Sequence, residues 1–277
     1  MEKIHCSVGI LTYNSGKNLR RALESVKNFS NIIIADGGST DDTLQIATEY
    51  GATVIDQYTK HHKGPNPHHP LSDFARERNQ LIAAATEDWY LWIDSDEYIS
   101  DTLRDEIKTV VANRALPYHA YEIPIGTQSP DARVTYTPWR QNYQIRFFNL
   151  RTDGRFERAM HERFVFDTKT YKTGRLKGFW YVPLSKPDFT SYSRTVRYRL
   201  AVLIDEYPID TFREYIYVTW YKNIRYTVGI FYRVLMSRLF LRHEHPFPLF
   251  YYRNQLYSVW VMFCLMNKKY FRSSKAI

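Results

Sequence analysis

The sequence predicts an α/β protein with a mostly parallel sheet flanked by helices, a smaller mixed lobe and a helical C-terminal tail. Up to Ala112, short apolar runs alternate with segments of helical periodicity, the pattern of a parallel sheet with helices on both faces. After Tyr118 the pattern changes to short alternating runs, which indicate strands and turns. From Tyr192 onward the periodicity is helical, and aromatic and basic residues are interleaved.

Strands and helices are expected to alternate in the first part of the chain. The expected strands are Val8–Leu11, Asn31–Ala35, Ala52–Ile55 and Trp89–Ile93. The expected helices run from Leu19 to Val26, from Ser39 or Thr40 to Gly51, from Ser72 to Ala85, and from Asp101 to Ala112. We expect Asn14 or Ser15 to cap the first helix and Ser39 or Thr40 the second, because short polar side chains satisfy free N–H groups there.

The chain is expected to divide into a domain over residues 1–190 and a tail over residues 191–277. Within the domain, residues 1–116 form the parallel half and residues 117–190 form the smaller lobe. The strand patterns of this lobe are Tyr121–Ile125, Arg133–Tyr136, Gln144–Asn149 and Glu162–Phe166.

In the tail, one face of a predicted helix collects Ile230, Phe231, Val234, Leu235 and Leu239, with Arg233, Arg238 and Arg242 beside it. The later stretch from Phe247 to Met266 is apolar but is interrupted by Pro248 and Arg253. Two explanations are open: a helix that lies in a membrane interface, and a helical cap packed on the domain or on a second subunit.

The composition favours a globular protein with phosphate-bearing partners. Of the 277 residues, 44% are apolar, and 38 basic against 29 acidic residues give a net charge of +9. This surplus favours nucleotides, nucleic acids or an anionic membrane surface. The two cysteines exclude a disulfide framework and fit a reducing cytosol. Neither a signal peptide nor a transmembrane segment is recognisable, so we expect a cytoplasmic protein, peripheral on the inner membrane face if the tail binds lipid.

Polar motifs follow three of the predicted strands: Thr12-Tyr13-Asn14, Asp36-Gly37-Gly38-Ser39 and Asp94-Ser95-Asp96. Because the carboxyl ends of parallel strands meet at one edge of a sheet, these side chains should share a ligand crevice. Asp94 and Asp96, two residues apart on a strand, should point the same way. Their like charges favour a cation between them, and Mn²⁺ or Mg²⁺ would suit these oxygen ligands. A plain turn is the alternative for this pair taken alone.

Taken together, these motifs and Arg78-Asn79 in the third helix resemble the A-type glycosyltransferases of family 2. The resemblance implies a Rossmann-like nucleotide-binding sheet, a nucleotide-sugar donor, a divalent metal and inversion at the anomeric carbon. By this match, residues 1–116 form the nucleotide-sugar half, residues 117–190 form the acceptor half, and Asp94 and Asp96 face the metal. The donor-binding residues by match are Thr12, Tyr13, Asn14, Asp36, Asp41, Arg78, Asp94, Ser95 and Asp96.

A second stretch resembles a bacterial subgroup that adds glucose to the inner core of lipopolysaccharide. The residues that match are Gln144-Ile145-Arg146-Phe147-Phe148 and Met160-His161-Glu162. The match implies Glu162 as the general base with His161 beside it, and Arg146 and Trp139 on the acceptor side. The rival bases are Glu97 and Asp101, and the alternative for Glu162 is a surface pair with Arg158 or Arg163.

Two further segments carry expectations. Relatives often have a metal-binding histidine after a Pro-Leu pair, whereas here Pro183-Leu184 precedes Ser185-Lys186-Pro187. Lys186 is therefore the candidate to neutralise phosphate charge in place of that ligand. The segment from Lys60 to Pro70 contains four histidines whose spacing does not suit a metal site. We expect either a lid over the donor or a plain exposed loop there.

The sequence thus predicts a metal-dependent inverting hexosyltransferase. The donor would be a nucleotide-sugar, a UDP-sugar by preference, and the acceptor a glycan or glycolipid of bacterial surface polysaccharide or lipopolysaccharide. The alternatives are a sugar nucleotidyltransferase, which would need a Gly-rich basic loop after the first strand, and a non-enzymatic basic nucleic-acid-binding protein. No P-loop and no recognised nucleic-acid motif is present, so nucleic acid is not an expected partner. A homo-oligomer formed through the tail is left open.

Overall fold

The computed structural model describes residues 2–58, 73–113, 115, 117–138, 140–159, 162–184, 188–205, 211–241 and 244–273, except for the side chains of residues 199, 202, 203, 205, 272 and 273. The chain forms two compact units. The first comprises Met1–Gln128 and Gln141–Pro183, and the second comprises Ser129–Arg140 and Leu184–Ile277. Each unit has a hydrophobic core of its own.

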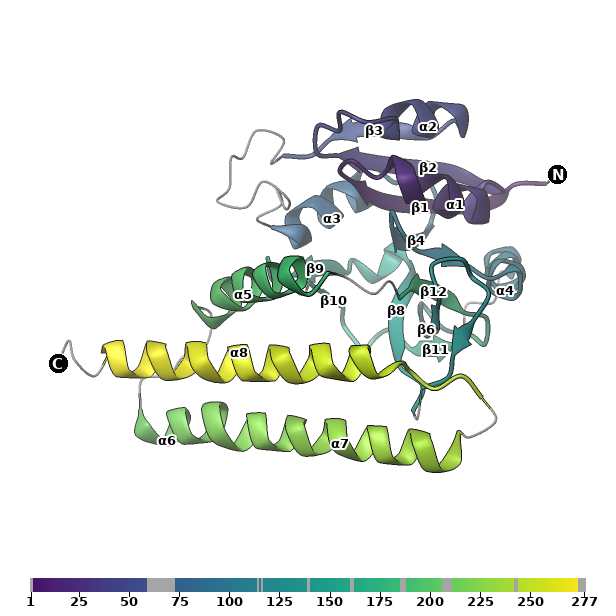
Figure 1. Cartoon of the computed structure of the whole chain (residues 1–277). Coiled ribbons are helices and arrows are strands. Elements are labelled where there is room, and N and C mark those ends of the chain that lie inside the picture. Colours follow the sequence, from purple (N-terminus) through teal and green to yellow (C-terminus); the bar gives the residue numbers. More distant parts are fainter. Residues whose placement is uncertain are drawn as a thin grey trace. The chain divides into compact units, whose positions relative to one another are not determined.

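The first unit is built on a mixed β-sheet with the strand order β3-β2-β1-β4-β8-β6-β12-β5 (Figure 1). Its first four strands are parallel neighbours: β3 (Thr53–Asp56), β2 (Phe29–Asp36), β1 (Ile4–Thr12) and β4 (Trp89–Asp94). The helices between them are α1 (Gly16–Val26), α2 (Thr43–Glu49) and α3 (Phe74–Ala83). The predicted alternation of strands and helices is confirmed, with slightly different ends.

The later strands extend the same sheet from the β4 edge. β8 (Tyr143–Asn149) runs antiparallel to β4 and to β6 (Ala120–Gln128), and β12 (Trp180–Pro183) lies between β6 and β5 (Tyr98–Ile99). β11 (Thr173–Arg175) also pairs with β6, and a 3₁₀ turn, Leu150–Thr152, follows β8. A separate hairpin consists of β9 (Arg155–Glu157) and β10 (Arg163–Val165). This is the mixed lobe that the sequence predicts.

Both faces of β1, β2 and β4 are covered, so their side chains alternate between two cores. On one face, Ile10 and Ile93 belong to a core shared with α1, α2 and α4 (Asp101–Ala112). On the other face, Leu11 and Trp92 pack with α3 and with Phe156 of β9. Burial on both faces explains why these strands are nearly continuous apolar runs in the sequence.

The helix caps differ from those that the sequence predicts. α1 and α2 begin after Ser15 and Asp42, and neither side chain makes a capping hydrogen bond. The Gly16 N–H at the start of α1 donates instead to the Asp41 carboxylate, 3.0 Å away. The Ser39 hydroxyl donates to Asp36 at the end of β2. The predicted caps are wrong because Ser39 binds Asp36 within its own loop, and Asp41 from the loop after β2 binds the start of α1.

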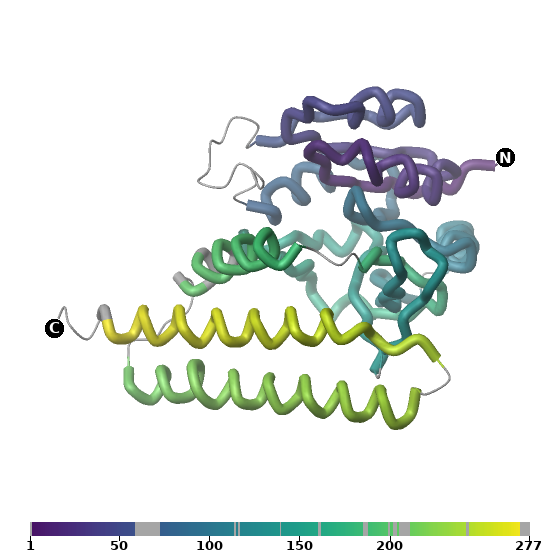
Figure 2. The backbone as a smooth tube through the Cα atoms, in the orientation of Figure 1, coloured from purple at the N-terminus to yellow at the C-terminus, as the bar shows by residue number. Residues whose placement is uncertain are grey.

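The second unit is mainly helical, as predicted for the tail. Its helices are α5 (Phe189–Asp205), α6 (Phe212–Tyr215), the π-helical segment Ile216–Tyr221, α7 (Lys222–Phe240) and α8 (Leu249–Ser273). α8 lies between α5 and α7 and packs against both (Figures 1 and 2). The segment that carries β7 (Thr135–Tyr136) joins this unit, since Thr137 bridges to Pro246 and the Tyr136 ring stacks on Phe247.

The inward face of α7 is set by its packing partners. Ile230 is buried in a small core with Phe247, and Val234 packs against that core, whereas Phe231 and Leu235 are exposed. The single apolar face predicted for this helix is therefore wrong in part, because periodicity alone did not reveal which side α8 covers. No helix in the described part of the chain combines the length and apolar character that a membrane span requires.

Gly178 is a position where the fold leaves no room for a side chain. A Cβ there would come within 2.2 Å of the backbone nitrogen of Leu103 and 2.4 Å of its Cα, in the first turn of α4. Because backbone atoms cannot rotate away, Gly178→Ala should lower the free energy of unfolding of the first unit by about 1–3 kcal/mol, as other overpacked sites do. Chemical denaturation followed by circular dichroism measures this change.

Gly229→Ala in α7 is the matched control for this substitution. The nearest atom to a Cβ at Gly229 is Nη1 of Arg233, at 3.6 Å, and alanine favours a helix more than glycine does. This control should be neutral or stabilising. A Gly178→Ala protein as stable as the unmodified chain would contradict the close approach of α4 to this turn.

Candidate active site

The three predicted motifs lie next to one another at the carboxyl ends of the parallel strands. Thr12 at the end of β1 is in register with Asp36 at the end of β2, and Leu11 is in register with Asp94 at the end of β4. Because β1 lies between β2 and β4, the loops that follow all three strands leave the sheet at the same edge. This edge is where open α/β sheets bind their ligands.

The Asp36 carboxylate holds the loop after β2. Its Oδ1 accepts hydrogen bonds from Thr12 Oγ1 at 2.8 Å and Ser39 Oγ at 2.6 Å, and its Oδ2 accepts the N–H groups of Gly38 at 2.9 Å and Ser39 at 2.8 Å. Gly38 has a φ of 88°, a conformation that glycine adopts without strain. The carboxylate predicted to contact a nucleoside therefore also shapes the loop that surrounds it.

Asn14 and Ser15 tie the three loops together. The Asn14 N–H donates to Ser39 Oγ at 2.8 Å, and its Oδ1 accepts the Thr40 N–H at 2.8 Å. The φ of Asn14 is 48°, in the left-handed region that asparagine tolerates better than most residues. The Ser15 hydroxyl lies 2.9 Å from the Ser95 hydroxyl. The loops after β1, β2 and β4 thus form one hydrogen-bonded unit.

Two further predicted donor residues flank this unit. Tyr13 is partly buried, and its N–H donates to Ser15 Oγ at 3.3 Å. Asp41 accepts the N–H groups of Gly16 at 3.0 Å and Thr43 at 3.1 Å. The Asp41 carboxylate therefore holds the starts of α1 and α2 in place, a supporting role that sequence matching did not distinguish from ligand contact.

The strand that carries Asp94 ends at that residue, and a turn carries Ser95 and Asp96. The Glu97 N–H donates to the Asp94 carbonyl oxygen at 3.0 Å and closes the turn. The strand alternation used to place Asp94 and Asp96 on one face is therefore wrong, because Asp96 no longer belongs to the strand. Partial desolvation and the negative charge of Asp94 raise the pKa of the exposed Asp96. This local negative field favours a cation.

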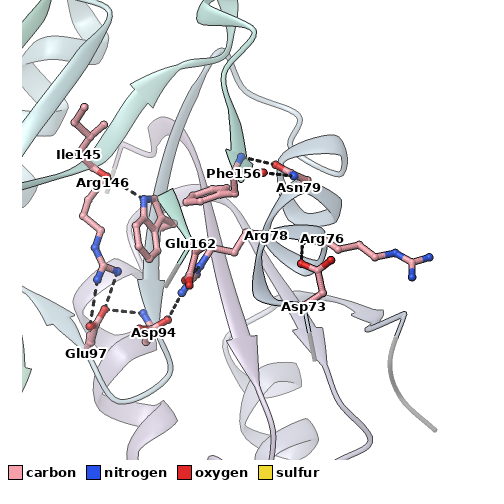
Figure 3. A network of polar contacts seen from close by, with 11 residues as sticks. Asp73, Arg76, Arg78, Asn79, Asp94, Glu97, Ile145, Arg146, Phe156 and Glu162 are labelled. Atoms are coloured by element: carbon pink, nitrogen blue, oxygen red, sulfur yellow. Dashed lines mark hydrogen bonds and ion pairs between the residues drawn. The ribbon is translucent and has the colours of Figure 1, made fainter. Parts of the chain in front are cut away.

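Arg78 of α3 lies at the centre of the site and bridges two carboxylates (Figure 3). Its Nη2 donates to Asp94 Oδ1 at 2.5 Å, and its Nε donates to Glu162 Oε1 at 2.6 Å. The side chain is 2% exposed, and the guanidinium carbon lies 4.0 Å from the centre of the Trp92 ring. Desolvation works against the charge of Asp94, but the charges of Arg78 and Arg146 outweigh it and lower the pKa of Asp94. Arg78 thus joins the end of β4 to the segment that precedes β10.

Asn79 attaches the β9–β10 hairpin to α3. Its Nδ2 donates to the Phe156 carbonyl oxygen at 2.9 Å, and its Oδ1 accepts the Phe156 N–H at 2.8 Å (Figure 3). Glu162 directly precedes β10, the partner of β9. The two residues of the Arg78-Asn79 motif therefore have different roles. Arg78 binds the carboxylates of Asp94 and Glu162, and Asn79 positions the hairpin beside Glu162.

Arg146, which the sequence predicts on the acceptor side, belongs to a buried ion pair beneath the Asp94 turn. It is buried, its Nη1 donates to Glu97 Oε2 at 3.0 Å, and its guanidinium lies 3.5 Å from the centre of the Trp92 ring and 3.4 Å from that of Trp180. Glu97 Oε2 also accepts the Asp94 N–H at 2.8 Å. The acceptor-side role predicted for Arg146 stays a prediction, while its observed contacts are those of a buried ion pair. The Arg146–Glu97 pair supports the turn that presents Asp94 and Asp96.

Glu162 is the best-placed base among the candidates. Its side chain is 14% exposed and is paired with Arg78 of α3, not with Arg158 or Arg163 as the alternative supposed. Of the rivals, Glu97 is buried, which raises its pKa against the opposing charge of Arg146. Asp101 is largely exposed at the start of α4 and pairs with Arg104. Glu162 alone combines partial exposure with a fixed connection to Asp94.

Some predicted features lie outside the described residues and stay predictions. They are His161 beside the base, Trp139 on the acceptor side, Lys186 near the phosphates and the histidine-rich segment over residues 60–70.

The protein ligands for a metal are few. Within the described ranges, no cluster of three His, Cys, Asp or Glu side chains could hold a metal ion. Asp96 is exposed, and Asp94 uses its Oδ1 for Arg78. Mg²⁺ is commonly held by one or two carboxylates and takes its remaining ligands from substrate phosphates and water. The residues present therefore fit a cation that binds together with a diphosphate.

The arrangement of the sheet and its helices is that of the A-type glycosyltransferase fold. Residues 7–179 match the family model of glycosyl transferase family 2, a range that contains all three strand-end motifs, Arg78 and Glu162. The chain belongs to glycosyl transferase family 2. The family predicted from the sequence is therefore confirmed.

Two relatives are similar in sequence to this chain over part of their length. An uncharacterized glycosyltransferase of Rickettsia felis is 35% identical over 183 residues, which cover 64% of this chain and 59% of the relative. The SPbeta prophage-derived glycosyltransferase SunS of Bacillus subtilis is 29% identical over 178 residues, 60% of this chain and 39% of the relative. This chain therefore spans less than two thirds of the length of either relative.

A solved structure shares the fold. The mannosyltransferase PcManGT from Pyrobaculum calidifontis, in complex with GDP-Man and Mn²⁺, superposes with a TM-score of 0.50 and 13% identity. The superposition covers 98% of this chain and 88% of that one.

The bridge made by Arg78 should be needed for stability. Arg78→Met leaves the Glu162 carboxylate in a largely buried position without its cation, and breaking such a pair typically costs about 3–5 kcal/mol. Because Asp94 is 41% exposed and can regain water, we expect the lower end of this range, about 3 kcal/mol. Urea denaturation of the variant measures the loss.

Arg20→Met is the control for this substitution. Arg20 forms an ion pair with Glu49 on the surface of the same unit, where exposed pairs contribute little. Its stability should match that of the unmodified chain. If Arg78→Met were as harmless as Arg20→Met, the central role of the bridge would be refuted.

Proposed function

We propose that the chain transfers a hexose from a nucleotide-sugar to a glycan or glycolipid acceptor, with inversion at the anomeric carbon and with help from Mn²⁺ or Mg²⁺. The observation that supports this proposal is the Arg78 bridge, which connects the Glu162 carboxylate to Asp94. The preferred donor is a UDP-sugar. By resemblance, the acceptor belongs to lipopolysaccharide or another bacterial surface polysaccharide.

The donor would bind at the unit formed by the three strand-end loops. Thr12 and Asp36 would lie beneath the nucleoside, and Tyr13 and Asn14 beside it. Support comes from the hydrogen bonds that hold these loops together, since a preorganised loop loses less entropy on binding. The complex of PcManGT with GDP-Man supports a nucleotide-sugar site in this fold.

Asp96 and Asp94 would hold the metal together with the donor diphosphate. When bound, a divalent cation stabilises the negative charge that develops on the departing nucleotide. Asp96 would hold the cation, because it is exposed and its ionisation is opposed by Asp94 until a cation arrives. Arg78 would keep Asp94 ionised and oriented through the bond to its Oδ1.

Glu162 would act as the general base. The acceptor hydroxyl attacks the anomeric carbon from the side opposite the diphosphate, and Glu162 takes its proton as the new glycosidic bond forms and the bond to the diphosphate breaks. Arg78 would hold the Glu162 carboxylate in one orientation through its Nε. His161 would assist by orienting the base or binding the acceptor.

The other predicted functions find less support. A sugar nucleotidyltransferase and a nucleic-acid-binding protein both fit the charge of the chain, but neither fits membership of glycosyl transferase family 2. A glycolipid acceptor would place the reaction at a membrane surface, in agreement with the peripheral membrane localisation predicted from the sequence.

Metal and nucleotide binding should be coupled, because Asp96 and the diphosphate would hold the cation together. UDP should raise the Tm when Mn²⁺ is present and much less when EDTA replaces it, since a ligand that binds only the folded state stabilises it. Asp96→Asn should remove the metal-dependent part of this increase. The exposed Asp88 provides the control Asp88→Asn, which should behave like the unmodified protein.

Differential scanning fluorimetry with UDP and with GDP, each with Mn²⁺, Mg²⁺ or EDTA, makes the comparison. An equal increase in Tm with and without metal would count against coupled binding. A larger increase with GDP than with UDP would overturn the preferred nucleotide but not the proposed reaction class.

Replacing the base should slow transfer without weakening donor binding. Glu162→Gln keeps the shape of the side chain and its ability to accept a hydrogen bond from Arg78, but it removes basicity. Loss of a general base should lower kcat by about 10²–10⁴-fold. The affinity for UDP with Mn²⁺ should stay nearly unchanged, because Glu162 does not touch the nucleotide.

The control for this variant is Glu157→Gln, which alters an exposed glutamate of the same hairpin that pairs with Arg155. Donor turnover is measured by UDP release in the presence of a glycan acceptor, alongside UDP affinity by calorimetry. A Glu162→Gln enzyme that keeps most of its transfer rate would exclude Glu162 as the base.

A further inference from the structure

An apolar stripe runs along the exposed side of the helix formed by α6, the π-helical segment and α7. We name as the α7 stripe the six exposed or half-exposed apolar side chains of α7 that lie together on one face. They are Ile224, Val228, Phe231, Tyr232, Leu235 and Leu239. Their spacing of three and four residues places them on one side of an α-helix.

The opposite side of α7 faces the rest of its unit. Asn223, Ile230 and Ser237 are buried and recur every seven residues, and α7 packs on α8. The tube drawing shows α7 with α8 along one side (Figure 2). The α7 stripe is therefore not the surface on which this helix packs within its own unit. Phe231 is 60% exposed and Leu235 is 56% exposed, which is unusual for side chains of this size.

The charged residues of α7 and α8 are all basic. α7 contains four Lys or Arg residues and α8 contains four, and neither helix contains Asp or Glu. Arg225 and Arg238 are exposed on α7 itself. Basic residues beside exposed aromatic and aliphatic side chains complement a surface that is apolar within and anionic at its edge. A bilayer rich in anionic lipid has this chemistry.

A hollow between α7 and α8 adjoins the stripe. Its volume is about 380 Å³, and stripe residues Ile224 and Val228 form part of its wall together with Trp260 and Phe263 of α8. Trp260 is itself exposed. A tryptophan at the rim of an apolar hollow suits the boundary between lipid headgroups and acyl chains.

We infer that the α7 stripe binds the surface of an anionic lipid bilayer, with the helix lying parallel to the membrane plane. Phe231, Leu235 and their neighbours enter the boundary between headgroups and acyl chains, while Arg225 and Arg238 contact lipid phosphates. Such helices lie on the membrane rather than cross it, in agreement with the lack of a spanning helix among the described residues. The inference goes beyond the proposed transfer reaction and does not depend on it.

The full chain with two stripe substitutions tests this inference. Phe231→Ser/Leu235→Ser removes two large apolar side chains that are already exposed, so the fold should persist. We expect the unmodified chain to sediment with phosphatidylcholine–phosphatidylglycerol vesicles and to bind pure phosphatidylcholine vesicles weakly. The double substitution should lower the partition constant by about tenfold or more, since each side chain loses its apolar contact with lipid. High salt should weaken binding of the unmodified chain because it screens the basic residues.

Phe240→Ser is the matched control. Phe240 is on the same helix and is 65% exposed, but helical spacing places it away from the stripe. This variant should keep nearly all of its vesicle binding, and circular dichroism should show the same helix content for all three proteins. Equal vesicle binding by the stripe variant and the unmodified chain would overturn the inference. A concentration-dependent dimer in analytical ultracentrifugation that the stripe variant abolishes, together with no vesicle binding, would also overturn it and assign the stripe to a second copy of the chain.

Discussion

The site depends on one buried positive charge, the guanidinium of Arg78. Arg78 is almost fully removed from water, and a charge in that position is tolerated only when acidic groups surround it. Asp94 and Glu162 meet this need, and they come from the end of β4 and from the segment before β10. The requirement to pair the cation therefore fixes the distance between the turn expected to face the donor and the carboxylate expected to activate the acceptor.

A second guanidinium extends the same arrangement. Trp92 of β4 lies close to both Arg78 and Arg146, and Trp180 lies close to Arg146 as well. Such contacts are favourable because the face of an aromatic ring is electron-rich. Arg146 in turn binds Glu97, which accepts the Asp94 N–H. The turn at Asp94 is therefore held at two points. Glu97, paired with Arg146, accepts the backbone N–H of Asp94, and Arg78 binds the Asp94 side chain.

Local patterns predicted most of the parallel half, while contacts between distant residues escaped prediction. β1, β2 and β4 were visible as apolar runs because both of their faces are covered, and the motifs at their ends identified the family. The sequence does not reveal the pairing of Arg146 with Glu97, 49 positions away. The sequence also does not distinguish the exposed side of α7 from its buried side, because α8 determines which side is covered. The predicted helix caps are wrong because Ser39 binds Asp36 instead of a helix N-terminus, and Asp41 of the neighbouring loop binds the start of α1.

The Arg78–Glu162 bond joins residues that are 84 positions apart, and this separation affects how the protein is made. During synthesis the ribosome releases the four parallel strands first, while Glu162 is still absent from the nascent chain. At that stage Arg78 can pair with Asp94 but not yet with Glu162, and Asn79 still lacks its hydrogen-bond partner, the Phe156 backbone. Domains generally fold as units once their chain is complete, and exposed strand edges before that point invite misassembly. The emerging parallel half thus presents an open β4 edge and an incompletely paired cation until β8 and the β9–β10 hairpin follow, so this interval is where a folding chaperone would be most useful to the chain.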